Sequence, residues 1–333
     1  MLFRPNILLP PQVAELVSAL RGAAPAAAAL VVSVDQEGGL VQRLRAPLTE
    51  WPDMLSVAAA GDTGRTEAVG RALGDELAAL GIGWNLAPVL DVHTNPGNPV
   101  IGNRAFGTDA AAVSRHALAF WRGLRAAGVL GCGKHFPGHG DTRADSHHEL
   151  PAVAHDEARL RAVELAPFAA AASAAMEAIM TAHVMFPALD PDWPATLSRR
   201  ILTEILRAQL GFCGLLVSDD LGMKAVADRW PIDEIVVRGL LAGIDHFLVR
   251  EPAARQVAAF EALVRAAEDR AEVRARVAES AARVAAFKAL SGVGLPLPIE
   301  QLASRLGTPE HRALAASFRR VDAAAPDGSP VVG

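Results

Sequence analysis

Short apolar runs alternate with amphipathic stretches along most of this 333-residue chain. The apolar runs are rich in leucine or β-branched residues and mostly lack polar alternation, which is typical of strands buried on both faces. They lie at residues 29–34, 83–89, 129–133, 178–182, 215–218 and 244–249. Helical periodicity fills the intervals, at residues 11–21, 65–80, 111–127, 157–174, 198–210 and 235–241, and continues at 253–267 and 271–290. The pattern predicts an α/β fold with a parallel sheet.

Polar and titratable side chains follow nearly every predicted strand. The first of each group are Asp35, Asp91, Lys134, His183, Asp219 and Arg250. A closed parallel barrel gathers the carboxyl ends of its strands around one mouth, where catalytic groups lie. An open, doubly wound sheet is the alternative, but it gathers such groups only at its switch point and often carries a glycine-rich phosphate turn, which does not follow Gly38-Gly39. We therefore predict a TIM-type (β/α)8 barrel.

The strand count falls short of eight. A stub at residues 1–3 raises the six strands to seven, so we expect the first βα unit of the barrel to be missing at the N-terminus. An open barrel wall exposes unpaired strand edges, which favours self-association of an otherwise monomeric protein. Residues 1–292 are predicted to form the catalytic barrel. Residues 293–333 are predicted to be a C-terminal extension that is partly disordered, with short helices near 299–306 and 310–319.

Charge and cysteine content exclude several classes of protein. The net charge of −5 disfavours a nucleic-acid partner held by phosphate contacts. Cys132 and Cys213 lie in apolar surroundings and are expected to be buried free thiols, since the sequence has no Cys-x-x-Cys pair. No signal peptide and no membrane-spanning run is evident, so we expect a cytoplasmic protein without a membrane partner.

The segment KHFPGHGDTRADSHHEL, residues 134–150, concentrates titratable groups in one loop. A metal site could use His135, His139, Asp141, Asp145 and His147, but Lys134 beside the first histidine would repel a cation. A solvated loop is the second alternative, and an acid/base site is the third. In Asp145-Ser146-His147 the carboxylate can orient the imidazole, which titrates near neutral pH, so we favour the acid/base site.

A second segment, LLVSDDLGM, runs from a buried strand directly into two aspartates. Asp220 could be a helix N-cap. Asp219 is nearest to the end of the strand, where a carboxylate can serve as a nucleophile, a base or a metal ligand. We therefore expect Asp219 to be a catalytic residue.

Three motifs together carry a resemblance to a known family: VDQEGGLVQRLR (34–45), KHFPGHGDTRADSH (134–147) and SDDLGM (218–223). Two further segments, NPVIGNRAFG (98–107) and TAHVMFP (181–187), fit the same pattern. The chain resembles the β-N-acetylhexosaminidases of glycoside hydrolase family 3 over nearly its whole length. The resemblance implies a barrel that removes N-acetylglucosamine from fragments of recycled cell wall in the cytoplasm.

The resemblance also implies roles for individual residues. Asp219 matches the nucleophile of a retaining glycosidase, His147 matches the general acid/base, and Asp145 matches its dyad partner. The sugar-binding positions are Asp35, Arg43, Arg104, Lys134 and His135. Neither a cofactor nor a metal is implied. Leu40 stands where the family often has an arginine, and His246 where an apolar residue is usual.

Other functions stay open at this point. A glycoside phosphorylase of the same family is possible, because a histidine repels an incoming phosphate less than a carboxylate does. A weakly active sugar-binding homologue is a further alternative if the first βα unit is missing. A β-glucosidase is disfavoured because the Asp-Ser-His loop offers no second carboxylic acid as a proton donor.

Overall fold

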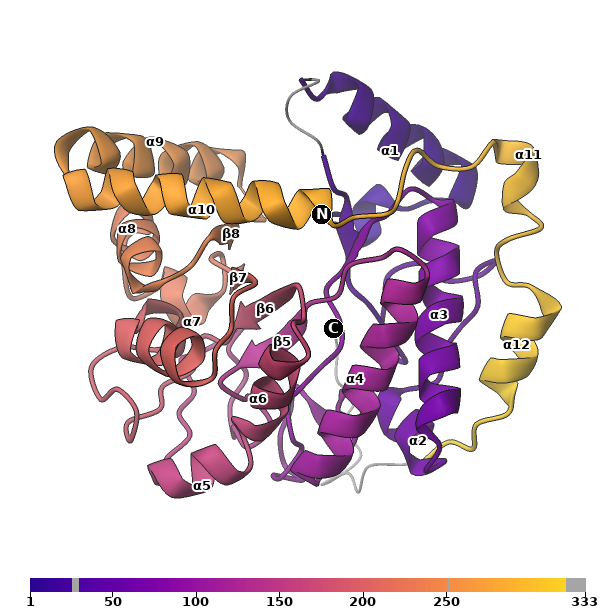
Figure 1. Cartoon of the computed structure of the whole chain (residues 1–333), viewed down its shortest axis with the longest axis horizontal. Coiled ribbons are helices and arrows are strands. Elements are labelled where there is room, and N and C mark those ends of the chain that lie inside the picture. The colour runs from indigo at the N-terminus through magenta and orange to yellow at the C-terminus, as the bar shows by residue number, and fades with distance from the viewer. Residues whose placement is uncertain (26–29, 251, 322–333) are drawn as a thin grey trace. The chain divides into compact units, whose positions relative to one another are not determined.

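The computed structural model describes residues 1–25, 30–250 and 252–321 (Figure 1). The chain forms two compact units. Unit 1 comprises Met1–Val89, Asn103–Gly133 and Lys288–Gly333, and unit 2 comprises Leu90–Gly102 and Lys134–Phe287. Each is described separately below.

Unit 1 contains four parallel segments that neighbour one another in chain order. Leu2 bridges to Val34 of β1 (Ser33–Val34), β1 pairs with β4 (Trp84–Asn85), and Trp84 bridges to Leu130. The predicted stub at residues 1–3 is thus a parallel neighbour of β1. A separate antiparallel hairpin joins β2 (Gln36–Gly38) to β3 (Val41–Gln42). Gly39 turns this hairpin with a φ of 57°, a conformation that glycine adopts without strain.

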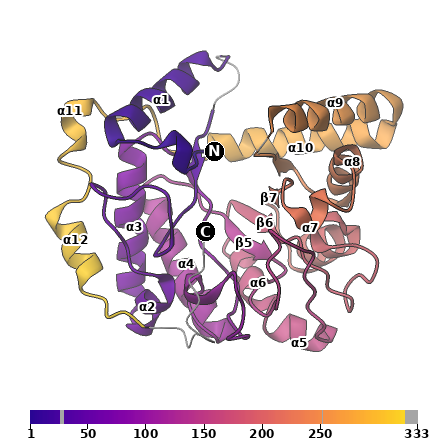
Figure 2. The ribbon, with the colours of Figure 1, turned by 180° about the vertical axis from the view of Figure 1, so that it is seen from behind.

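The helices of unit 1 lie between and beyond these segments. Helices α3 and α4 run side by side in both views (Figures 1 and 2), and each begins at an aspartate whose side chain accepts backbone N–H groups, Asp62 for α3 and Asp109 for α4. The elements are η1 (Arg4–Asn6), α1 (Pro10–Ala23), α2 (Met54–Ala59), α3 (Thr63–Ala79), η2 (Gly102–Arg104, whose first residue belongs to unit 2), α4 (Ala110–Ala126), α11 (Ile299–Leu302) and α12 (Pro309–Ala316).

Unit 2 is built on a four-stranded sheet with the order β5-β6-β7-β8. The strands are β5 (Gly133–Phe136), β6 (Ala178–Thr181), β7 (Leu215–Asp220) and β8 (His246–Leu248), and the β6–β7 and β7–β8 pairs are parallel. Its helices are α5 (Glu157–Ala162), α6 (Ala166–Ser173), η3 (Ala195–Leu197), the π-helix η4 (Arg200–Gln209), α7 (Lys224–Ala227), α8 (Ile232–Ala242), α9 (Ala253–Asp269) and α10 (Ala271–Ala289), which extends two residues beyond the unit.

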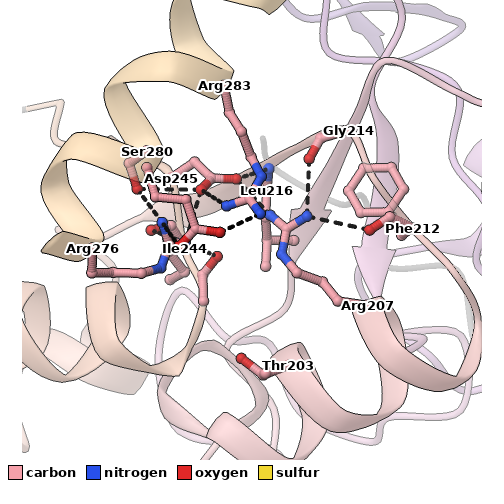
Figure 3. Close-up of polar contacts among 12 residues, drawn as sticks. Thr203, Arg207, Phe212, Gly214, Leu216, Ile244, Asp245, Arg276, Ser280 and Arg283 are labelled. Atoms are coloured by element: carbon pink, nitrogen blue, oxygen red, sulfur yellow. Dashed lines mark hydrogen bonds and ion pairs between the residues drawn. The ribbon is translucent and has the colours of Figure 1, made fainter. Parts of the chain in front are cut away.

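A network around one carboxylate joins α10 and η4 to this sheet. Asp245, whose side chain is fully buried, accepts hydrogen bonds from Arg207 at 2.6 Å, Arg276 at 2.8 Å and Arg283 at 3.2 Å (Figure 3). Ser280 and the Leu216 backbone N–H also donate to it. Because Asp245 lies just before β8, these bonds fix the start of that strand and leave its carboxyl end to the neighbouring loops.

The predicted α/β class is confirmed, and seven of the eight long predicted helices occur as single elements. The exception is residues 157–174, which form α5 and α6 because residues 163–165 separate two short helices, the second with Pro167 in its first turn. In both units the parallel segments follow chain order, as in a barrel and unlike a doubly wound sheet with a switch point. Among the described residues the strand pairings do not close into a ring, so the closed barrel and its missing first unit stay predictions.

The predictions for the two cysteines and for the short C-terminal helices can also be compared with the structure. Cys132 is buried as expected, but Cys213 is exposed because it lies in the turn between η4 and β7 rather than in a core. Residues 293–321 contain both short helices that the sequence predicts, α11 and α12. The predicted disorder of the last dozen residues falls outside the described part of the chain.

Candidate active site

Strand β5 carries Lys134 and His135, which are both buried. His135 is held by Asp91, whose Oδ2 atom accepts from the ring Nδ1 at 2.7 Å. The Oδ1 atom of Asp91 accepts the backbone N–H groups of His135 at 3.2 Å and His139 at 2.6 Å. These three hydrogen-bond donors offset the free-energy cost of burying the Asp91 carboxylate. Asp91 therefore fixes the His135 ring and the turn that follows it.

Asp219 lies near the end of β7, where its half-buried side chain accepts the backbone N–H of Asp220 at 2.8 Å. Burial alone raises the pKa of Asp219. The charges of His135 and His183, the Asp220 hydrogen bond and the charge of Lys134 outweigh burial and lower the pKa below its ordinary value. Asp219 is therefore ionised at neutral pH, as a carboxylate nucleophile must be.

His183 is the fully buried neighbour of Asp219. Its Nε2 atom donates to the carbonyl oxygen of Asp220 at 3.1 Å, and its Nδ1 atom lies 2.7 Å from the hydroxyl of Thr196. Burial lowers the pKa of His183, Asp219 and Asp220 oppose this shift, and the charge of His147 adds to it. Asp219 and His147 thus lie within electrostatic range of the same imidazole.

The loop at residues 141–150, here called the flap, carries the predicted dyad. The Nδ1 atom of His147 donates to Oδ1 of Asp145 at 2.7 Å, and the backbone N–H of His147 donates to the same oxygen at 2.8 Å. Partial burial raises the pKa of Asp145, but these two bonds and the charges of His147 and His148 lower it overall. The carboxylate fixes the proton on Nδ1, which leaves Nε2 of His147 to exchange a proton with a ligand.

The start and the middle of the flap are tied to other residues of unit 2. At its start, Asp141 pairs with His155 and accepts from the Thr94 hydroxyl at 3.1 Å. Further along, the hydroxyl of Ser146 lies 3.0 Å from Nε2 of His139, and its carbonyl accepts the N–H of Ala225 at 3.3 Å. Ser146 is buried between two more accessible neighbours, because the His147 side chain is 62% exposed and that of Asp145 28%.

The remaining predicted residues belong to unit 1. Asp35 and Arg43 form an ion pair at 3.5 Å, with Asp35 the less exposed partner. Arg104 donates from Nε and Nη2 to the two carboxylate oxygens of Glu37, both at 2.9 Å. These two parallel hydrogen bonds orient the guanidinium group of Arg104, because both can form only when its plane is aligned with the carboxylate of Glu37. The structure thus brings these residues together in pairs within unit 1. Leu40 is 71% exposed in the β2–β3 turn.

Two features, a metal-binding group of side chains and a membrane-spanning helix, are not found in the described part of the chain. Across residues 1–25, 30–250 and 252–321, no three histidine, cysteine, aspartate or glutamate side chains gather in a group that could hold a metal ion. The helices of these same residues include none that combines the length and the apolar character required to cross a membrane.

Comparison with known proteins identifies the family. Residues 3–287 match the family described as "Glycosyl hydrolase family 3 N terminal domain". The chain is 37% identical to beta-hexosaminidase A of Pseudoalteromonas piscicida, over 95% of this chain and 57% of that protein. It is 40% identical to the beta-hexosaminidase of Pseudomonas aeruginosa strain LESB58, over 79% of this chain and 78% of that protein. Its fold matches the family 3 β-N-acetylglucosaminidase from Paenibacillus sp. str. FPU-7 with a TM-score of 0.88 and 41% identity, covering 94% of this chain and 60% of that chain.

Unit 2 thus combines carboxylates at the end of β7 with an aspartate–histidine pair on the flap. The chain belongs to glycosyl hydrolase family 3, as its motifs predicted. It spans 57% of the length of the first relative and 60% of the Paenibacillus chain.

Several residues of the site escaped the sequence reasoning. Asp91 and His183 were noted only as polar groups after a strand, and Glu37, Ser146 and His139 received no role in the acid/base site. For Asp91, His183 and Glu37, a position after a predicted strand was the available signal, whereas Ser146 and His139 lie in the histidine-rich segment at residues 134–150. Their partners lie 44 residues away for Asp91 and His135, and 67 for Glu37 and Arg104, so no local spacing reveals the contacts.

Proposed function

We propose that this protein is a retaining β-N-acetylhexosaminidase that hydrolyses terminal β-linked N-acetylglucosamine. The observation that carries the proposal is the presence in unit 2 of an ionised Asp219 near the end of β7 and of a His147 that Asp145 orients on the flap, with the charges of both acting on His183. The relatives named beta-hexosaminidase and β-N-acetylglucosaminidase support the choice of sugar.

The reaction proceeds in two steps. The carboxylate of Asp219 attacks the anomeric carbon and the glycosidic bond breaks, while Nε2 of His147 donates a proton to the leaving oxygen. Nε2 then takes a proton from water, which attacks the anomeric carbon and frees Asp219. The carboxylate of Asp145 stabilises the imidazolium and holds its ring. General acid/base assistance of this kind contributes about 10²–10⁴ in rate.

The family motifs imply sugar-binding roles for Lys134 and His135, and likewise for Asp35, Arg43 and Arg104. Lysine and arginine donate to hydroxyl and acetamido oxygens, and aspartate accepts from hydroxyl groups. The substrates are fragments of recycled cell wall that end in N-acetylglucosamine, and the compartment is the cytoplasm. These assignments rest on the family motifs.

Two measurements test this function. The protein should release p-nitrophenol from p-nitrophenyl N-acetyl-β-glucosaminide, and Asp219→Asn should lower kcat by at least about 10³, since it removes the nucleophile. A 5-fluoro N-acetylglucosaminyl fluoride should label Asp219, as peptide mass spectrometry would reveal. Labelling of another carboxylate, or full activity in the variant, would refute the assignment.

Product analysis separates hydrolysis from phosphorolysis. Free N-acetylglucosamine should form at the same rate with and without phosphate. Formation of the sugar 1-phosphate would identify the protein as a glycoside phosphorylase instead.

A further inference from the structure

Ser146 lies between the two dyad residues of the flap, Asp145 and His147, and is buried against the rest of unit 2. Ser146 is 2% exposed, although it separates Asp145 from His147, whose side chain is largely in solvent. The position of the dyad therefore depends on how firmly Ser146 is held. The contacts of Ser146 come from two different parts of the unit.

The first contact is with His139, which is also 2% exposed. Its Nε2 atom lies 3.0 Å from the Ser146 hydroxyl, and its Nδ1 atom lies 2.8 Å from the Thr142 hydroxyl. The backbone N–H of His139 donates to Asp91, the same carboxylate that holds His135. A neutral imidazole satisfies both hydroxyl contacts with one nitrogen donating and the other accepting, so His139 needs no charge to hold the flap.

The second contact joins the flap to the segment that follows the nucleophile. The N–H of Ala225, in α7, donates to the carbonyl oxygen of Ser146 at 3.3 Å. Ala225 lies six residues after Asp219 and directly beyond the turn in which the N–H of Met223 donates to the carbonyl of Asp220. Ser146 is thus tied on one side to the turn after β5 and on the other to the chain leaving β7.

We propose that His139 and Ser146 are positioning residues for the acid/base step. They hold the Asp145–His147 pair in the position from which it acts together with Asp219. They act through the flap and touch neither the sugar nor the reacting atoms. The proposal rests on the proposed function and adds two residues to its machinery. It implies that loss of the Ser146 hydroxyl impairs proton donation to the leaving group more than it impairs attack by Asp219.

Leaving-group dependence is the readout that a merely structural role would not change. A 2,4-dinitrophenyl glycoside departs with little protonation, whereas a phenyl glycoside requires a proton from His147. In Ser146→Ala we expect kcat/KM for phenyl N-acetyl-β-glucosaminide to fall about tenfold, the equilibrium effect of one lost hydrogen bond. The value for the dinitrophenyl glycoside should fall by less than about twofold, because nucleophilic attack is intact. His139→Leu should show the same larger loss for the phenyl glycoside than for the dinitrophenyl glycoside. If this variant does not fold, the test rests on Ser146→Ala alone.

The matched control is Ser280→Ala. Ser280 is a serine of similar burial, 5% exposed, whose hydroxyl donates to a buried carboxylate, but it belongs to the Asp245 network on α10 (Figure 3). Its loss should affect both glycosides equally. Equal losses for the two substrates in Ser146→Ala, or no loss for either, would overturn the proposal.

Amide hydrogen exchange separates this proposal from the proposed function. Ser146→Ala should speed exchange in peptides that cover the flap, residues 141–150, while Ser280→Ala should leave them unchanged. If the wild-type protein cleaves neither glycoside, the proposed function fails, and faster flap exchange still supports the anchor. Unchanged exchange in the flap would overturn the anchor whatever the activity.

Discussion

Asp219 combines burial, which disfavours a charged carboxylate, with neighbours that favour one. Among the groups that lower its pKa, Lys134 acts through its positive charge. The pKa of the nucleophile sets the acidic limb of kcat/KM, because activity is lost when the carboxylate becomes protonated. This limb can be moved by changing one residue.

Lys134→Gln is expected to move the acidic limb of kcat/KM to higher pH. Removing the positive charge destabilises the Asp219 carboxylate, so its pKa rises and protonation begins at a less acidic pH. The profile should be measured with p-nitrophenyl N-acetyl-β-glucosaminide, and circular dichroism should verify folding at each pH. Lys224→Gln removes the same charge from an exposed site on α7 and should leave the limb in place. An unmoved limb in Lys134→Gln would contradict the electrostatic account.

How far the site could be predicted depends on the distance between partners in the sequence. Asp145 and His147 are two residues apart, so their spacing alone suggested the hydrogen bond that the structure contains. Asp91, Glu37 and His183 act through partners on other strands or loops, and only the fold brings them together. Cys213 was misplaced because its apolar neighbours in the sequence do not surround it in the turn.

The sheet of unit 2 depends on a carboxylate that lies in no strand or helix. Asp245 is bonded to Arg207 of η4 and to Arg276 and Arg283 of α10, while Leu216 of β7 donates to it from the backbone (Figure 3). Periodicity in the sequence located η4, β7 and α10 but gave no sign of this junction. The physical reason is that periodicity reports which face of an element is buried, and not which polar group it meets there.

Asp245→Ala should destabilise the protein by about 3–5 kcal/mol, since it removes the fully buried carboxylate that all three of Arg207, Arg276 and Arg283 contact. Urea unfolding, followed by circular dichroism, would measure the loss. Glu279→Ala offers a control, because Glu279 also pairs with Arg276 and Arg283 but its side chain is 52% exposed. It should cost less than about 1 kcal/mol. Similar losses in both variants would argue against the buried carboxylate as the source of stability.

The predicted domain boundary at residue 292 lies within unit 1, which also contains residues 293–321. The C-terminal residues pack within unit 1, where Arg21 donates to the carbonyl of Val293 and the N–H of Leu297 donates to the carbonyl of Ala79. The buried carboxylate of Glu76 accepts the N–H of Gly307 at 2.8 Å and faces Nδ1 of His311 at 3.1 Å. The proline-rich composition that suggested an extension is accompanied by an irregular path outside α11 and α12, and both side-chain and backbone hydrogen bonds hold this path to the rest of unit 1.

Ending the chain at Gly292 is therefore expected to destabilise unit 1 by more than about 3 kcal/mol. The truncation exposes the surface that Leu302 and Leu306 cover, and burial of one leucine side chain is worth about 1.5–3 kcal/mol. It also leaves Glu76 buried with only the Thr49 donors. Thermal unfolding of the truncated and full chains would measure the difference. Ser317→Ala, which removes an exposed contact with Arg65 in the same segment, should change stability by less than about 0.5 kcal/mol. A truncated chain that unfolds at the temperature of the full chain would show instead that residues 1–292 are a self-sufficient domain.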